Sequence, residues 1–441
     1  MIDPGSNFEC KSWKPLVEGS SPLAASCSAW LKDISSDVFE QNYQVGPNFR
    51  ATYRFYEEAL LFCYMASISE DPKWRSAMVD RLNSVIGAAR HIRALGLYGG
   101  LCGAGWVTEH VSRFHEQLHD DPAETVHDEE EGYDPNAALD LAILRAVRSW
   151  RLDGSYDLVS GLVGIGLYCL ERLPVETVVA SLECIADHLY KTSQRSAEGT
   201  TWLTLPTVMP DWQGKIAPNG YYNLGTAHGI PGIIYLVAEL AIRGIRSDLC
   251  WELFNQTLRW LINHQNPSGS ASRFCSWFTE EATAPSRLAW CYGDLGIVGV
   301  LSHAGRITGD STCIDFAEQL LTDTLSRPST SSGVRDAPLC HGAMGISHVF
   351  NRLFHTVHDV RCREMAIRWL EEALNFRRPG EGVGGVLAYA QNKPNEVGQW
   401  EANPAFLGGA IGVGLALISA IYEIEPSWDR LLLISGCATA Q

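Results

Sequence analysis

Two cysteines and one histidine stand beside glycine-rich stretches in the second half of the 441-residue chain. Cys291 lies in "AWCYGDLGI", and Cys340 and His341 are adjacent in "LCHGAMGI". Two thiolates and one imidazole are a recognised ligand set for zinc, and three protein ligands leave a fourth position open for water or substrate. The two stretches are far apart in the sequence, so a metal site requires a fold that brings them together.

A short glycine motif, G-x-x-G, recurs along the chain and points to such a fold. Its six copies begin at Gly100, Gly161, Gly229, Gly293, Gly342 and Gly409. Near-regular self-similarity of this kind is typical of architectures built from one repeated supersecondary unit. Glycine suits a turn inside each unit because it takes positive φ freely and lets two backbones approach closely.

The segments around the glycine turns predict helices of two kinds. Apolar segments such as 233–241 follow the turns, and amphipathic segments such as 175–189 lie between them. A helix that is apolar nearly all round must be surrounded by protein, whereas an amphipathic helix can cover it and face water. We therefore expect an all-α (α/α)6 toroid, with six outer-helix/inner-helix pairs forming a single domain over residues 1–441. An open solenoid is the alternative.

Residues 405–422 are uncharged over a length that meets the threshold for a membrane span. They contain the sixth copy of the glycine motif, however, and so read as the sixth inner helix. We expect no integral membrane segment.

We call the two residues before the first glycine of each copy the lip. Aligning the copies places Cys291 and Cys340 at the same lip position in neighbouring repeats, so a toroid brings both sulfur atoms to one end of the ring. His341 follows directly, and we predict that these three residues bind one zinc ion per chain. Two alternatives are cysteines that only pack and a rival metal pair, His355 and His358, which we expect on a solvated face.

Four further polar residues gather near the lips: Asp157, His228, Arg287 and Tyr292. Taken singly, each has a structural interpretation, as a helix cap, a surface ion pair or a turn residue. Together with a metal at the same mouth they are typical of an active site.

Composition narrows the class of protein. The net charge of −17 argues against nucleic acid as a partner, because phosphate contacts are made mostly by clustered Lys and Arg. The thirteen cysteines, an odd number without any C-x-x-C, and an N-terminal stretch without an apolar core favour free thiols in a reducing cytoplasm. Residues 115–136 form an acidic loop, either solvated or docking a basic peptide, and residues 194–224 read as extended and irregular.

The glycine-rich stretches resemble the lanthionine synthetase C-like family, and within it the stand-alone cyclases of lanthipeptide biosynthesis. "LYGGLCGAG", "GYYNLGTAHGIPG", "AWCYGDLGI" and "CHGAMGI" occur in the order found in that family. The resemblance implies an α/α toroid with one zinc ion held by positions matching Cys291, Cys340 and His341. It also implies that Cys thiols of a dehydrated precursor peptide are joined to dehydroalanine or dehydrobutyrine of the same peptide, giving lanthionine or methyllanthionine rings.

The resemblance also assigns roles by motif position. His228 matches the acid/base histidine, Arg287 the active-site arginine, Asp157 the carboxylate and Tyr292 the tyrosine beside the metal cysteine. One departure is Asp294, which stands where many members have a small or hydroxyl residue and adds a charge near the metal. The even spacing leaves little room for the extra small domain of some members, and only 194–224 could hold a reduced version.

The expected partner is the dehydrated lanthipeptide precursor, with a dehydratase and an exporter as further members of a modification complex. Two alternatives remain open within the family: a non-catalytic scaffold that binds zinc and peptide, and an enzyme that adds a small thiol such as glutathione to dehydrated residues. A glycoside-processing toroid would need two carboxylates across its cavity, and the gathering of Cys and His at the lips speaks against it.

Overall fold

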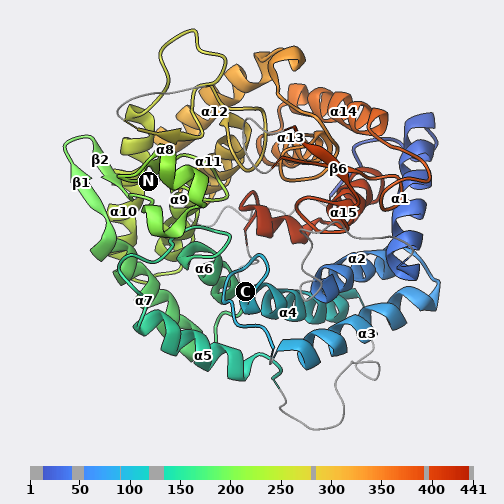
Figure 1. Ribbon diagram of the computed structural model, residues 1–441, viewed down its shortest axis with the longest axis horizontal. Coiled ribbons are helices and arrows are strands. Elements are labelled where there is room, and N and C mark those ends of the chain that lie inside the picture. The colour runs from blue at the N-terminus through green and yellow to red at the C-terminus, as the bar shows by residue number, and fades with distance from the viewer. Residues whose placement is uncertain are drawn as a thin grey trace.

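Helices dominate the computed structural model, which describes residues 13–41, 54–89, 91–118, 134–279, 285–391 and 397–436. Seven described helices form an inner ring: α2 (Arg54–Ile68), α4 (Leu101–Leu118), α6 (Leu162–Glu171), α9 (Ile230–Ile242), α11 (Asp294–Thr308), α13 (Ala343–Val357) and α15 (Ala410–Ile421). Seven more lie outside them: α1 (Pro22–Glu40), α3 (Pro72–Ala89), α5 (Ala137–Arg148), α7 (Glu176–Thr192), α10 (Ser247–Asn263), α12 (Ser311–Ser326) and α14 (Val360–Asn375). Figure 1 shows the two concentric rings.

Burial distinguishes the two rings as the apolar patterns predict. The inner helix α9 is buried along nearly all of its length, whereas the outer helix α10 buries one face and exposes the other. Each inner helix contacts the next one around the ring, and α15 contacts α2, which closes it. The predicted α/α toroid is therefore confirmed.

The helix α2 is a seventh inner helix that the glycine motif does not mark. At the start of α2, side chains rather than a glycine turn connect the helix to the neighbouring turns. The Glu57 carboxylate accepts a hydrogen bond from the backbone N–H of Phe406 (3.0 Å), and the Tyr56 hydroxyl accepts one from the N–H of Gly99 (2.9 Å). These contacts join α2 to the sixth and first turns, so the described ring has seven pairs where the repeat predicts six.

The glycines of the turns are required by close backbone approach. A Cβ atom on Gly345 would overlap the carbonyl oxygen of Leu339, and one on Gly296 would overlap that of Trp290. Gly293 also has φ +111°, a conformation that residues with a side chain rarely adopt. The second glycine of the motif thus lets the first turn of the inner helix sit directly on its own lip.

A belt of backbone hydrogen bonds links the six lips at one mouth of the ring. The N–H groups donate to carbonyl groups of the following repeat in the pairs Tyr98–Val159, Leu158–Ala227, Ala227–Cys291, Cys291–Cys340 and Cys340–Leu407, at 2.8 to 3.3 Å. Lips that are far apart in the sequence are therefore held side by side, in register.

The last described segment fills the centre of the ring. Its 3-10 helix η5 (Ser427–Leu432) carries Asp429, which is fully buried and accepts hydrogen bonds from His348 (3.0 Å) and Arg352 (2.8 Å) of α13. The Trp290 indole N–H donates to the carbonyl oxygen of Leu432 at 2.7 Å. The ring thus encloses a packed core rather than a channel.

Short elements connect the helices on the side of the lips. They are β1 (Gln194–Ser196), β2 (Gly199–Thr201), η3 (Pro206–Val208), α8 (Asp211–Ile216), β3 (Tyr222–Asn223), β4 (Trp277–Phe278), η4 (Ser329–Ser331), β5 (Ala388–Ala390) and β6 (Gln399–Glu401). The pairs β1–β2, β3–β4 and β5–β6 are antiparallel. Residues 194–224 therefore hold a small hairpin, two short helices and one strand that pairs outside the segment.

Two further sequence predictions concern a membrane span and the acidic loop. Among the described helices, none combines the length and the apolarity needed to cross a membrane. The apolar stretch 405–422 contains α15, which contacts α1, α2 and α13. Most of the predicted acidic loop 115–136 lies outside the described residues, which omit 119–133.

Candidate metal centre and active site

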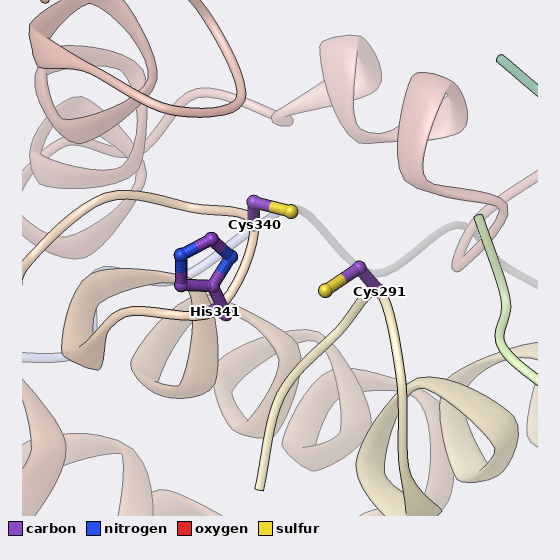
Figure 2. Close-up of side chains that lie close together, drawn as sticks. All are labelled: Cys291, Cys340 and His341. Carbon is purple, nitrogen blue, oxygen red and sulfur yellow. The ribbon is translucent and has the colours of Figure 1, made fainter. Parts of the chain in front are cut away.

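The two cysteines and the histidine predicted as metal ligands come together at the mouth of the ring. The ligand atoms of Cys291, Cys340 and His341 all lie within 4.8 Å of one another, and no other group of this kind occurs among the described residues. Figure 2 shows the three side chains on the tips of two neighbouring loops, directed into a shared space. Cys291 is buried and the other two are half-buried. The hydrogen bond from the N–H of Cys291 to the carbonyl oxygen of Cys340 (3.2 Å) sets this arrangement.

The electrostatics of this cluster favour a bound cation. The hydrogen bond from Cys340 lowers the pKa of the Cys291 thiol, with smaller contributions from His341 and Arg287. The Cys291 thiolate in turn raises the pKa of Cys340 through the same hydrogen bond. Each thiolate thus disfavours ionisation of the other thiol, and a positive charge between them would relieve this repulsion. Two sulfur atoms and one imidazole nitrogen at this separation fit zinc, which binds such sets at about 2.0–2.3 Å per ligand.

His228 on the third lip and Asp157, just before the second lip, form an ion pair. His228 Nδ1 lies 2.6 Å from Asp157 Oδ2. Asp157 is held in place by Ser160, whose N–H (2.8 Å) and hydroxyl (3.2 Å) donate to Oδ1. Burial alone would lower the pKa of His228, but the hydrogen bond and charge of Asp157 outweigh it and raise that pKa. Burial likewise raises the pKa of Asp157, and His228 more than reverses this, so the Asp157 pKa is lowered.

Tyr292 and Arg287 complete the predicted set. The ring of Tyr292 stacks on that of His228 with centroids 6.1 Å apart, and burial raises the pKa of its hydroxyl. Arg287 is exposed, and its positive charge contributes to lowering the pKa of Cys291. Its guanidinium group is thus available at the mouth. The rival pair is separate from this site: His355 stacks on Trp13.

Asp294 has a structural role at the mouth rather than a place in the cluster. Its carboxylate is buried and accepts the backbone N–H groups of Arg273 (2.8 Å) and Phe274 (2.9 Å). Burial raises the pKa of this carboxyl, although the two hydrogen bonds partly oppose the shift. Asp294 therefore anchors the loop before β4 to the start of α11.

Two polar residues of the site, Asn223 and Asp336, were not predicted from the alignment of the lips. Asn223 is buried, accepts the N–H of Gly225 (2.9 Å) and donates to the Tyr292 hydroxyl (3.3 Å). Asp336 is buried near His341, with one carboxylate oxygen bonded to the N–H of Tyr389 and the other without a hydrogen-bond partner among the described residues. The signal for both is a shared register: like Arg287, each stands six positions before the first glycine of its copy.

The chain matches known proteins over most of its length. Residues 59–433 match the family model described as lanthionine synthetase C-like protein. One curated relative, "Nisin biosynthesis protein NisC" of Lactococcus lactis subsp. lactis, is 23% identical over 223 residues, which are 46% of this chain and 50% of the relative. This alignment thus spans about half the length of that relative.

A solved structure, titled "Nisin cyclase", has a TM-score of 0.68 and 16% sequence identity to this chain. The match covers 92% of this chain and 96% of the other. At this identity the likeness concerns the fold, and it agrees with the closed double ring of helices.

Proposed function

The chain belongs to the lanthionine synthetase C-like family, and we propose that it is a zinc-dependent lanthipeptide cyclase. In this proposal it adds Cys thiols of a dehydrated precursor peptide to dehydroalanine or dehydrobutyrine of the same peptide. One observation carries the proposal: a Cys2His cluster on the fourth and fifth lips lies at the same mouth as the ion pair between His228 of the third lip and Asp157. A nucleophilic thiol and a proton donor can then act on the same substrate.

Cys291, Cys340 and His341 would hold the zinc ion. Zinc bound there would keep a substrate thiol in its thiolate form at neutral pH, where a free Cys with a pKa of about 8.5 is mostly protonated. The thiolates of Cys291 and Cys340 would offset the charge of the ion, so the sulfur of the substrate stays electron-rich. The close approach of the three ligand atoms, all within 4.8 Å of one another, supports this assignment.

Arg287 is suited to stabilise the charge that develops during addition. When the substrate thiolate bonds to the β-carbon of the dehydro residue, the double-bond electrons move toward the neighbouring carbonyl oxygen and form an enolate. A fixed cation near that oxygen lowers the barrier. Arg287 is exposed at the mouth and close enough to Cys291 for its charge to favour the thiolate, so its guanidinium group can reach a substrate bound there.

His228 is suited to deliver the proton that completes the reaction. The enolate must receive a proton at its α-carbon, and an imidazolium whose pKa lies near neutrality is an effective donor. Asp157 stabilises the charged form of His228 and fixes its ring through the 2.6 Å contact. Tyr292 stacks on the ring and confines it on the other side.

The proposal also implies a partner reaction. Dehydroalanine and dehydrobutyrine arise by loss of water from Ser and Thr, so a dehydratase must act before this chain. A complex with that dehydratase and with an exporter of the finished peptide is part of the proposal.

The test is thioether formation by purified protein. The substrate is a synthetic peptide with one dehydroalanine and one Cys that stays protected until the assay starts, and a sample without protein measures spontaneous closure. We expect loss of the free thiol at unchanged peptide mass, in a protein that holds about one zinc ion per chain.

Other outcomes separate the alternatives. A peptide that gains the mass of glutathione, when glutathione is added, would assign small-thiol addition instead. A protein that holds zinc and binds the peptide without any gain over the spontaneous rate would be a scaffold. Absence of bound zinc would refute the metal site itself.

A further inference from the structure

A cavity of about 480 Å³ opens beside the His228–Asp157 pair. It is lined by Asp157, His228 and Tyr292, by uncharged polar residues such as Thr192 and Gln213, and by a group of apolar residues. The apolar group includes Leu152, Leu205, Val208 and Met209. The metal-ligand cluster does not line it. Its volume falls in the range of sites that enclose a small organic group.

The walls of the cavity are held to the toroid before any ligand arrives. The Tyr156 hydroxyl bonds to that of Thr204 (2.8 Å), and the Trp202 indole N–H donates to the carbonyl oxygen of Leu189 on α7 (2.9 Å). The backbones of Thr204 and Tyr221 exchange two hydrogen bonds, at 2.8 and 3.2 Å. The segment that carries η3 therefore forms a fixed wall opposite the second lip.

Bare apolar surface stands at the entrance of this cavity. Leu152 is 70% exposed and Val208 is 40% exposed, and both line the cavity. Covering such surface by an apolar group is favourable because it removes the surface from water. The charged side chains that line the cavity already have partners of opposite charge, because Asp157 pairs with His228 and Asp153 pairs with Arg151. A charged ligand group would therefore lose its water without gaining a free partner there.

The order of the lips indicates which part of a peptide reaches the cavity. The metal ligands occupy the fourth and fifth lips, His228 the third and Asp157 the stretch before the second. A peptide whose thiol lies at the ligands and whose α-carbon lies at His228 places the residues attached to the dehydro residue beside the second and third lips. These are the lips that the cavity adjoins.

From this arrangement we propose that the cavity is a specificity pocket for an uncharged, apolar side chain directly flanking the dehydroamino acid of the substrate. The inference rests on the proposed function, because it takes the direction of the peptide from it. Leu152 and Val208 are specificity-determining residues in this proposal, and they select the substrate rather than take part in bond formation.

Equilibrium binding tests the pocket without relying on catalysis. The probes are two fluorescein-labelled peptides, Gly-Gly-Leu-Dha-Leu-Gly-Ser-Gly and its counterpart with Asp in both Leu positions, where Dha is dehydroalanine and Ser replaces the reacting Cys. Fluorescence anisotropy measures their binding to the zinc-loaded wild type and to the variants Leu152→Asn and Val208→Asn. The matched control is Val360→Asn, which changes an apolar residue that is 59% exposed at the start of α14.

We expect the wild type and Val360→Asn to prefer the Leu peptide by about tenfold or more, as hydrophobic pockets commonly do. The preference should fall below about threefold in Leu152→Asn and Val208→Asn, because the amide removes apolar surface without adding a charge that would repel the Asp peptide. Indistinguishable binding of the two peptides to the wild type, including no binding of either, would overturn the pocket, as would an unchanged preference in both pocket variants.

The same peptides with Cys in place of Ser separate this inference from the proposed function. Ring formation without any preference between the Leu and Asp peptides contradicts the pocket and leaves the cyclase in place. Preferential binding of the Leu peptide without ring formation supports the pocket and contradicts the cyclase.

Discussion

The toroid contains two histidine–carboxylate pairs of the same length in very different surroundings. At the mouth, His228 lies 2.6 Å from Asp157, and their side chains are 39% and 12% exposed. In the C-terminal half of the inner helices, His303 of α11 lies 2.6 Å from Glu239 of α9, and their side chains are 2% and 1% exposed. The distances are equal, so the contact itself does not distinguish them.

Access and neighbours separate the roles of the two pairs. The mouth pair lines a cavity and lies near the lips that carry the Cys2His cluster, so it is accessible from outside. The interior pair is enclosed, and Glu239 also pairs with Arg243, so it can only join α9 to α11. A histidine–carboxylate contact is therefore evidence of catalysis only where a substrate can reach it. The mouth pair is thus expected to affect the reaction, and the interior pair is expected to affect the stability of the fold.

The largest effect is expected from the metal ligands. Cys291→Ala or Cys340→Ala should abolish zinc retention and lower kcat/KM for ring formation by at least about a thousandfold, because a metal supplies several kcal/mol. Zinc content by atomic spectroscopy and the thiol assay measure the two losses. Cys250→Ala, which removes a buried thiol of α10, should keep the metal and the activity. Zinc retention in both lip variants would contradict the assignment.

The two histidines should show opposite losses when each is changed to asparagine. His228→Asn should lower kcat by about 10²- to 10⁴-fold, the usual contribution of a general acid, with zinc content and unfolding free energy near those of wild type. His303→Asn should lower the unfolding free energy by about 1–3 kcal/mol, since Glu239 loses a buried donor, with kcat nearly unchanged. Urea denaturation and the ring assay distinguish them. Equal losses of activity in His228→Asn and His303→Asn would contradict the different roles assigned to the two pairs.

The pH profile should respond to the mouth carboxylate only. Asp157 raises the pKa of His228, so Asp157→Asn lets that pKa fall. A protonated His228 is the proposed acid, and its activity disappears as pH rises through its pKa. The alkaline decline of kcat/KM should therefore begin at a lower pH in Asp157→Asn. Glu239→Gln should leave the alkaline decline where it is in wild type, and a shift there would show that the pairs are not separable.

The smallest effect is expected from Asp294, a carboxylate near the mouth with a structural role. Asp294→Asn keeps an oxygen acceptor for one of the two N–H groups of the loop before β4, so it should cost about 1 kcal/mol of stability. The ring-forming rate should change less than about threefold. A larger change in rate at constant zinc content would mean that the negative charge tunes the metal centre.

The repeat accounts for what could be predicted from the sequence. The close approach of Gly345 to the Leu339 carbonyl, repeated at other turns, forces each inner helix to begin beside its own lip. Aligning the glycines then predicts which lip residues meet, and this is how Cys291 and Cys340 could be paired. The toroid and the proximity of the three ligand residues follow from one motif.

The remaining features do not repeat and could not be predicted in this way. The start of α2 joins the belt through the side chains of Tyr56 and Glu57, so no glycine marks it. The cavity wall depends on contacts such as the one between Tyr156 and Thr204, which the sequence does not reveal. Asn223 and Asp336 are an intermediate case. Both stand six positions before the first glycine of their copies, but their side chains differ, so the repeat indicates the position and not the role.

The closure of the ring has a consequence for synthesis of the chain on the ribosome. The contact between α1 and α15 joins an early helix to one that is synthesised more than 350 residues later. Growing chains can form local helix pairs such as α13 with α14, but the long-range contacts must wait until α15 and η5 have emerged. Until then the circle of helices is open, and the fourth lip lacks its inner support, the hydrogen bond from Trp290 to Leu432.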